Sequence, residues 1–317
     1  MPDGLDELAR VVDVGAQRLA THDDAAIVLA VSGGPDSMAL LHGAARLVET
    51  DVRRWRLTVA HLDHALRPDS ADDARFVVEA AEAMALRFEG LRTDVVALAR
   101  DEGRSIEEAA REARYRFLEA VSPEGALIAT AHTADDAAET VLLNLLRGAG
   151  LAGARGIPAR RGRIVRPLLG ARRATLHELL EAAGIGYRID PSNADPAFLR
   201  NRVRNEVLPL LEEIRPGAAE RIGQFSRLAA DDEALLEGLA NAELARRTTD
   251  NGIDWHDPPL PALGRRVLRL ALGAPAPSAE RIEALREAAE GSRGGVTIEL
   301  GGGRVASVSR RRVRILT

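Results

Sequence analysis

The stretch AVSGGPDSMALL (residues 30–41) places two adjacent glycines between an apolar run and a helical pattern. The apolar run, residues 25–31, is typical of a buried strand in a parallel sheet. Pro35 suits the first turn of the helix that follows. At such a junction the helix N-terminus presents backbone N–H groups and its positive dipole end to an anion. The stretch therefore predicts a phosphate-binding loop over residues 32–37, the alternative being an ordinary strand-to-helix turn.

Two widespread phosphate-loop motifs are excluded. The Walker-type loop requires a lysine, and all 43 basic residues of this chain are arginine. A GxGxxG pattern occurs at residues 148–153, but it follows an amphipathic helical segment, residues 140–147, and not a strand. We therefore do not expect this pattern to bind a dinucleotide.

The composition is that of a soluble globular protein long enough for about two domains, with 317 residues, 46% hydrophobic and 29% charged. The first residues lack the layout of a secretion signal, and the longest uncharged stretch, residues 25–35, is far shorter than a membrane span. We therefore expect a cytoplasmic protein with no membrane partner. The absence of cysteine excludes disulfides, thiolate zinc sites, iron–sulfur clusters and cysteine nucleophiles.

The formal charge of −5 conceals one strongly basic segment. Residues 148–175 contain no acidic residue and seven arginines, namely Arg155, Arg160, Arg161, Arg163, Arg166, Arg172 and Arg173. We expect this segment to bind a polyanion. A second run of arginines, within residues 310–314, is equally well explained as solvated surface.

Runs typical of strands alternate with segments typical of helices over residues 27–183. The expected strands are residues 27–31, 57–61, 94–98, 127–131 and 164–168. The expected helices are residues 36–48, 70–86, 105–120, 135–147 and 172–183, of which the third begins with a capping box of Ser105 and Glu108. The alternation predicts an α/β fold with a doubly wound, mostly parallel sheet that binds ligands at the carboxyl ends of its strands.

The pattern changes after about residue 215, where Pro216 and Gly217 indicate a linker. Helices are expected over residues 220–246, 260–272 and 279–290, followed by small strands within residues 295–316. We therefore expect a catalytic domain over residues 1–215 and a smaller, mainly helical domain over residues 216–317.

The strongest candidate for a reactive cluster is His132 with Asp136 and Glu139. Their spacings of four and seven residues stack the side chains on one face if all three lie on a helix. One histidine and two carboxylates are a known metal-ligand set. The alternative is a polar first helical turn in which Asp135 and Asp136 favour the helix dipole.

Three other stretches carry polar clusters. His61 and His64, three residues apart, give only a weak indication of a metal site. Arg111 and Arg114 lie three apart on an expected helix, where they either pair with a glutamate of the preceding turn or neutralise phosphate. The turn at residues 190–193 is followed by three arginines, whose guanidinium groups suit phosphate or carboxylate.

Together these stretches resemble the tRNA(Ile)-lysidine synthetase family, a branch of the ATP enzymes with a pyrophosphatase loop. The signatures of the family occur in order, within residues 26–211, as SGGPDS, HLDHALRPDSADD, AREARY, AHTADDAAETVLLNLLRGAGLAG, RPLL, DPSNAD and RNRVRNEVLPLL. The remainder, from residue 216, looks like the short form of the family, with one C-terminal domain that contacts tRNA.

The resemblance implies a two-step reaction that uses ATP and Mg²⁺. ATP first adenylates the C2 carbonyl oxygen of the wobble cytidine in a tRNA(Ile) with a CAU anticodon. The ε-amine of free L-lysine then attacks C2 and expels AMP, which forms lysidine. The expected partners are therefore this tRNA and L-lysine, with a homodimer among the options for the oligomeric state.

The resemblance also implies roles for individual residues. The expected ATP site consists of Ser32, Gly33, Gly34, Asp36, Ser37, His61, Arg111 and Arg114, and Asp36 also binds the metal. Asp136 and Glu139 are expected to meet the lysine amine, and one nearby carboxylate or His132 to take its proton. The remaining expected substrate contacts are Asn193 and Arg204, to tRNA or the lysine carboxylate, and Arg147, Arg155, Arg160 and Arg161, to tRNA phosphates.

Three other function classes share the loop or the basic segment. The tRNA thiolases resemble the chain in the loop region but rely on cysteine, which is absent here. Amidating relatives, such as GMP and asparagine synthetases, lack the RGAGLAG and RNRVRNEVLP stretches. A non-catalytic RNA-binding protein would not require the intact loop from Ser32 to Ser37.

Overall fold

The computed structural model of the protein describes residues 4–66, 70–190, 195–274, 276–291, 295–301 and 303–316. The chain divides into two compact units, Met1–Arg227 and Leu228–Thr317, and helix α11 (Ala218–Arg247) runs through the division. The boundary expected from the sequence, between residues 215 and 216, falls between α10 (Leu208–Ile214) and this helix. The separate roles expected for the two parts remain predictions.

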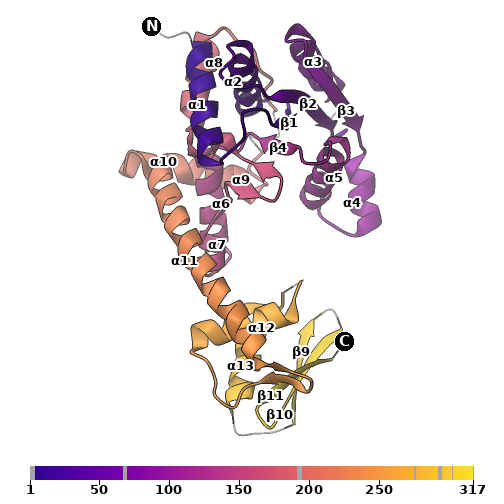
Figure 1. The fold of residues 1–317 in the computed structure, drawn as a ribbon, viewed down its shortest axis with the longest axis vertical. Helices are drawn as coiled ribbons and strands as arrows, with labels where there is room; N and C mark the ends of the chain where they lie inside the picture. Colours follow the sequence, from indigo (N-terminus) through magenta and orange to yellow (C-terminus); the bar gives the residue numbers. More distant parts are fainter. Residues whose placement is uncertain are drawn as a thin grey trace. The chain divides into compact units, whose positions relative to one another are not determined.

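The first unit contains a six-stranded sheet in the order β3-β2-β1-β4-β6-β5, of which β1 to β4 are labelled in Figure 1. Every neighbouring pair is parallel except β5 with β6. The strands are β1 (Ala26–Ala30), β2 (Arg56–Asp63), β3 (Arg87–Arg92), β4 (Leu127–Thr130), β5 (Arg160–Arg161) and β6 (Ile164–Val165). The predicted doubly wound, mostly parallel α/β fold is confirmed.

Helices cover both faces of this sheet because successive strand residues point to opposite sides. On one face, Ile27 and Leu29 share a core with α1 (Gly4–Arg18), α2 (Pro35–Glu49) and α8 (Arg173–Ala182). On the other face, Val28 shares a core with Phe117 of α5 (Ile106–Val121). The other helical segments before α10 are α3 (Ser70–Ala83), α4 (Val95–Glu102), α6 (Ala134–Leu146), α7 (Leu151–Ala154), η1 (Pro167–Gly170), α9 (Leu199–Arg202) and the π-helical η3 (Val203–Val207).

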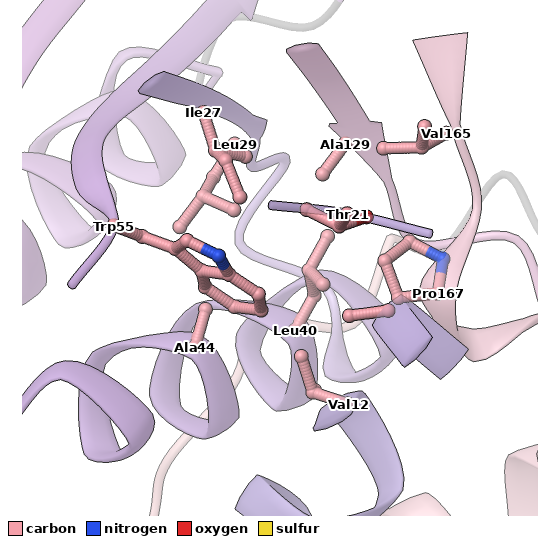
Figure 2. A pocket seen from close by; sticks show the side chains of 11 residues that line it. Val12, Thr21, Ile27, Leu29, Leu40, Ala44, Trp55, Ala129, Val165 and Pro167 are labelled. Atoms are coloured by element: carbon pink, nitrogen blue, oxygen red, sulfur yellow. The ribbon is translucent and has the colours of Figure 1, made fainter. Parts of the chain in front are cut away.

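A small cavity lies in the larger of these cores, with Val12, Leu40, Trp55 and Pro167 in its walls (Figure 2). Its volume of about 10 Å³ is at the lower limit of the space that one water molecule needs. Its walls are almost entirely apolar. The cavity is therefore a packing defect of the core, and ligand binding is expected at the edge of the sheet.

The prediction of a strand at residues 94–98 is wrong. Asp94 caps helix α4 by accepting hydrogen bonds from the N–H groups of Val96 and Ala97. The third strand is instead β3, whose side chains are mostly exposed at the edge of the sheet. An edge strand needs no apolar run, whereas a short apolar run such as VVALA fits a helix as well as a strand.

The second unit combines helices with a five-stranded antiparallel sheet in the order β7-β8-β11-β10-β9. Its elements after α11 are β7 (Thr248–Thr249), β8 (Gly252–Asp254), α12 (Pro261–Leu272), α13 (Ala279–Glu290), β9 (Val296–Gly301), β10 (Arg304–Ser309) and β11 (Arg312–Leu316). Trp255, Leu268 and Leu285 are fully buried in its core. Neither unit, within its described residues, has a helix long and apolar enough to cross a membrane.

Candidate active site

The predicted phosphate loop connects β1 to α2 at the carboxyl edge of the sheet. Gly33 has a φ of +87°, a conformation that side-chain-bearing residues rarely adopt, and its carbonyl accepts a hydrogen bond from the N–H of Arg188 at 2.9 Å. Gly34 is the N-cap of α2, Pro35 occupies the first turn, and Gly34 itself supplies no side-chain cap. The first N–H groups of a fifteen-residue helix are therefore suited to bind an anion.

Hydrogen bonds within the loop and to β2 fix its shape. The N–H of Ser32 donates to Ser37 Oγ at 3.2 Å, and the Ser37 hydroxyl donates to the carbonyl of Gly34 at 2.8 Å. Buried His61 lies with Nδ1 2.9 Å from the carbonyl of Val31, and because a carbonyl only accepts, Nδ1 carries the proton. Burial lowers the pKa of His61, so the ring is neutral at pH 7. His61 thus supports the backbone from which the loop starts.

Asp36 lies in the first turn of α2 and has one unsatisfied oxygen. The Nε–H of Arg173 donates to Asp36 Oδ2 at 3.1 Å. Within the described part of the chain, the buried Oδ1 has no hydrogen-bond partner. Nε2 of His177, which also has none there, lies 3.9 Å from it. Burial raises the pKa of Asp36, which Arg173 opposes and the nearby charge of Asp136 reinforces. A buried carboxylate oxygen without a donor is a suitable ligand for a cation.

Three carboxylates and three arginines meet beside this loop. We call them the carboxylate–arginine cluster, and its members are Asp36, Asp136, Glu139, Arg173, Arg200 and Arg204. Glu139 is fully buried and accepts from Arg204 Nε at 2.7 Å, Arg200 Nε at 3.0 Å and Arg173 Nη1 at 3.2 Å. Asp136 Oδ1 accepts from the same arginines at 2.9 to 3.3 Å. Because the formal charges of the cluster cancel, six ionic groups can be held together in a largely buried place.

The other oxygen of Asp136 caps helix α6. Thr133 donates to Asp136 Oδ2 from both its N–H and its hydroxyl at 2.8 Å, and the Asp136 N–H returns a bond to Thr133 Oγ1 at 3.3 Å. Burial alone would raise the pKa of Asp136, but Arg173, the Thr133 N–H and Arg200 hold that pKa below its usual value. Asp136 is therefore ionised at neutral pH, with one oxygen bound to the helix and one to the arginines.

His132 precedes α6, so it does not stack with Asp136 and Glu139 on one helix face as the spacing suggested. Its Nδ1 lies 2.9 Å from Thr130 Oγ1. Burial lowers the pKa of His132 to about 4, against the attraction of Asp136, so the ring is neutral at pH 7. No three His, Asp or Glu side chains among the described residues are arranged to hold a metal ion. His132, Asp136 and Glu139 therefore do not form a metal site, and the two carboxylates form ion pairs with arginines instead.

Arg111 and Arg114, which the sequence grouped together, lie in different surroundings. Arg114 donates to Nε2 of His64 at 3.1 Å. Arg111 lies over the ring of Tyr115, with 5.1 Å between its Cζ and the ring centroid. Arg161 of β5 lies over the same ring at 5.5 Å. Arg111 and Arg161, an arginine of the basic segment, thus share one aromatic ring.

The other arginines expected to bind RNA also differ from one another. Arg147 and Arg155 are exposed, and their side chains have no ion-pair or hydrogen-bond partner within the described residues. Arg160 donates from Nε to the carbonyl of Gly162 at 3.1 Å. Asn193 lies outside the described residues.

The sequence placed Arg173 in the basic segment and Arg200 among the three arginines after residues 190–193, but it predicted for neither a contact with Asp136 or Glu139. Arg200 and Arg204 are four residues apart, so one helix face carries both, and that spacing was a usable signal. Arg173 gave no local signal, because its partners Glu139 and Asp36 lie 34 and 137 positions earlier in the chain.

A polar pocket of about 150 Å³ adjoins the carboxylate–arginine cluster. Arg200 lines this pocket and also binds Glu139, and the lining includes Glu107, Arg147 and Phe198. The volume accommodates several water molecules or a small polar group. A substrate group of that size can therefore approach the cluster from this side.

The sequence matches a family model described as the PP-loop domain over residues 9–211. The chain is 46% identical over 225 residues to a tRNA(Ile)-lysidine synthase from Geobacter sulfurreducens, which covers 69% of this chain and 47% of that protein. It is 48% identical over 229 residues to a tRNA(Ile)-lysidine synthase from Thermus thermophilus, which covers 72% of this chain and 43% of that protein. The chain thus spans a little less than half the length of these curated relatives.

Among solved structures, the chain is similar to a U34-tRNA thiolase from Methanococcus maripaludis that carries a 4Fe–4S cluster. The TM-score is 0.58 at 17% sequence identity, and the match covers 72% of this chain and 79% of the thiolase. At this identity the likeness concerns the fold alone.

Proposed function

The chain belongs to the PP-loop domain family, and on this basis we propose that it uses ATP to ligate L-lysine to C2 of the wobble cytidine of a tRNA(Ile) with a CAU anticodon. The observation that carries the proposal is that Asp36 belongs both to the phosphate loop and to the carboxylate–arginine cluster. One place can therefore bring together a nucleotide and an amine nucleophile. The curated relatives support the choice of RNA and product.

In the proposed first step, the C2 carbonyl oxygen attacks the α-phosphorus of ATP, and the bond to the β-phosphate breaks. The phosphate loop would bind the leaving pyrophosphate through Ser32, Ser37 and the first N–H groups of α2. Mg²⁺ would be held by Asp36, whose buried Oδ1 has no hydrogen-bond partner among the described residues, and when bound it would offset charge on the departing pyrophosphate. Arg114, next to His64 at the end of β2, and His61 behind the loop complete this site in the proposal.

In the proposed second step, the ε-amine of lysine attacks C2, the C–N bond forms and AMP leaves with the oxygen. Asp136 and Glu139 already bind arginines, so the lysine amine has to share or replace an existing ion pair. Arg204 donates to both Glu139 and Asp136. In the proposal, it would bind the lysine carboxylate when the lysine amine takes its place beside them. His132 is neutral at pH 7 and is close enough to Asp136 for the carboxylate charge to raise its pKa. It is therefore the proposed acceptor of the proton that the lysine amine loses.

The proposed RNA contacts include Arg147, Arg155 and Arg161, which are exposed and unmatched by carboxylates within the described residues. Phosphate contacts of this kind position an RNA without reading its sequence. Arg160 differs from these three, because its Nε donates to the carbonyl of Gly162, and we leave it out of the proposed RNA contacts. Asn193, the cytoplasmic location and the homodimer remain predictions.

The rival functions have less support. A sulfur-transfer reaction like that of the thiolases is disfavoured because the chain has no cysteine to bind a cluster or relay sulfur. An amidating ligase would not explain the long match to tRNA(Ile)-lysidine synthases. A non-catalytic RNA-binding protein would not explain a phosphate loop that ends in the partly satisfied carboxylate of Asp36.

The test is incubation of the protein with ATP, labelled L-lysine and an unmodified tRNA transcript that has a CAU anticodon. We expect ATP-dependent incorporation of label into the RNA, together with ATP–pyrophosphate exchange that requires this RNA. A transcript with G in place of the wobble C is the matched control and should take no label. If the CAU transcript remains unlabelled, the proposed function is wrong.

A further inference from the structure

A second arginine group surrounds Tyr115 on α5. Arg111 of the same helix and Arg161 of β5 lie over the ring, with 5.1 and 5.5 Å from each Cζ to the ring centroid. Arg166, which follows β6, lies beside the Tyr115 hydroxyl. We call these four residues the Tyr115 cluster. It brings together side chains from three separate parts of the chain.

The Tyr115 cluster carries three positive charges, and none of its arginines has a carboxylate partner within the described residues. Arg111 forms no ion pair with Glu107 or Glu108 of its own helix, and Glu108 is bound instead in the capping box with Ser105. A surface ion pair therefore does not explain Arg111.

Arg166 is the buried member of the cluster, with 3% of its surface exposed. Its Nη1 donates to the carbonyl of Pro158 at 2.5 Å, but its buried Nε has no hydrogen-bond partner among the residues that the structure describes. Burial lowers the pKa of Arg166, the neighbouring Tyr115 hydroxyl opposes this change, and repulsion from Arg161 and Arg111 adds to it. A buried donor without an acceptor, among charges of the same sign, is an unfavourable arrangement that a bound anion would relieve.

We propose that the Tyr115 cluster binds one phosphate of the RNA backbone. This inference rests on the proposed function, since it takes RNA as the substrate. Guanidinium groups match phosphate oxygens well, and the ring holds two of them in place before the RNA arrives. Side chains that are ordered in advance lose less conformational entropy on binding.

The position of the cluster in the sheet separates it from the nucleotide. The phosphate loop follows β1, whereas Arg166 follows β6 and Arg161 lies on β5. In the order β1-β4-β6-β5, with about 4.8 Å between neighbouring strands, β6 lies about 10 Å and β5 about 14 Å from β1. Arg114, next to His64 at the end of β2, lies beside the β1 loop. Arg111 lies only one turn of α5 from Arg114, so the separated part of the cluster is its β5–β6 side with Arg161 and Arg166. That side favours a long polyanion such as RNA over the nucleotide as the ligand.

The test compares three single variants of the full chain, Arg161→Gln, Arg111→Gln and Arg160→Gln. Arg160 is the matched control, because it is the neighbouring exposed arginine on β5 and bonds the carbonyl of Gly162 instead of facing Tyr115. The exposed Arg111 and Arg161 are preferred to buried Arg166, whose loss could unfold the protein. Binding of the CAU transcript is measured over a range of KCl concentrations and repeated with a tRNA transcript that has another anticodon.

The plot of log K against log salt has a negative slope, and a lost phosphate contact makes it less steep by about one unit. We therefore expect Arg161→Gln and Arg111→Gln each to flatten the slope by up to about one unit with both transcripts, and Arg160→Gln to keep the parental slope. The affinity for ATP, measured without RNA, should be unchanged in all three variants. For Arg111, which lies over the Tyr115 ring, this replaces the ATP contact that the family resemblance implied.

Three results would overturn the inference. Equal flattening by Arg160→Gln and Arg161→Gln would mean that the whole strand attracts RNA and that the Tyr115 cluster is no discrete site. Weaker ATP binding with an unchanged slope would assign the cluster to the nucleotide. An unchanged slope together with unchanged ATP binding would mean that the Tyr115 cluster only stabilises the fold and binds no ligand. Because this assay needs no lysine transfer, a protein that binds RNA as expected but incorporates no lysine would refute only the proposed function.

Discussion

The carboxylate–arginine cluster and the Tyr115 cluster both lie in the first unit, and both affect the pKa of His132. Their arginines have opposite kinds of partner. In the carboxylate–arginine cluster every guanidinium has carboxylate partners, and Glu139 is fully buried among them. In the Tyr115 cluster the guanidinium groups meet an aromatic ring and each other, with no carboxylate partner in the described part of the chain. Burial is the main cause of the low pKa of His132, and each group adds a smaller effect, because Asp136 raises that pKa and Arg166 lowers it.

This difference indicates what each group requires from a ligand. The charges of the carboxylate–arginine cluster already cancel, so a substrate has to exchange with an existing ion pair. The charges of the Tyr115 cluster are uncompensated, so an arriving anion adds stabilisation without displacing a partner. Loss of a charge from the first group should therefore damage the protein itself, whereas loss of a charge from the second should weaken only binding.

The largest effect is expected from Asp36→Ala, because Asp36 belongs to both the phosphate loop and the carboxylate–arginine cluster. We expect ATP-dependent pyrophosphate release to fall by about 100-fold or more, since metal-ion stabilisation is worth several kcal/mol. Binding of tRNA should remain nearly intact, because Asp36 contacts no RNA in the proposal. Asp101→Ala removes an exposed carboxylate from α4 and should change neither quantity. Near-normal pyrophosphate release by Asp36→Ala would remove this residue from the ATP site.

Glu139→Gln tests whether the carboxylate–arginine cluster holds the fold together. Glu139 is fully buried and pairs with three arginines, so its loss removes one of the three negative charges that balance them. We expect the free energy of unfolding to fall by about 3 kcal/mol in denaturant titration. Glu178→Gln, at an exposed position of α8, should stay within about 0.5 kcal/mol of the parent.

The same variant should also impair lysine transfer more than adenylation if Glu139 meets the lysine amine. Equal loss of both steps would assign Glu139 to the metal or to the fold alone.

Arg173→Gln should have the smallest of these effects, and its size should depend on pH. Burial raises the pKa of Asp36 and Arg173 opposes the rise, so the variant should have a still higher Asp36 pKa. An acid whose pKa is higher in the folded state binds more protons there, so stability falls as pH rises from the unfolded value of 3.8. We therefore expect a deficit of about 2 kcal/mol near pH 7 that shrinks towards pH 4. Unfolding curves across this range would contradict the prediction if the deficit stayed constant.

Local features of the sequence were sufficient for the phosphate loop and for most helices. The loop needs an apolar run, a glycine with positive φ and a proline in the first helical turn, and all of these lie within residues 30–41. The capping box of Ser105 and Glu108 is likewise a contact between residues three apart, and the structure confirms it. The prediction of a strand at residues 94–98 was wrong because an apolar run of five residues does not distinguish a helix from a strand. Asp94 caps the segment, which therefore starts a helix.

The sequence by itself determined the alternation of strands and helices, the phosphate loop at the end of β1, and the placement of Asp136 and Glu139 on one face of α6. Only the tertiary structure decided which arginine meets which partner. Arg173 reaches Asp36 across 137 positions of the chain, and Arg161 faces Tyr115 while its neighbour Arg160 bonds a backbone carbonyl. The physical reason is range. Helix caps, turns and apolar periodicity act over a few residues, whereas ion pairs and ring contacts depend on distances through space that exist only after the sheet and its helices have packed.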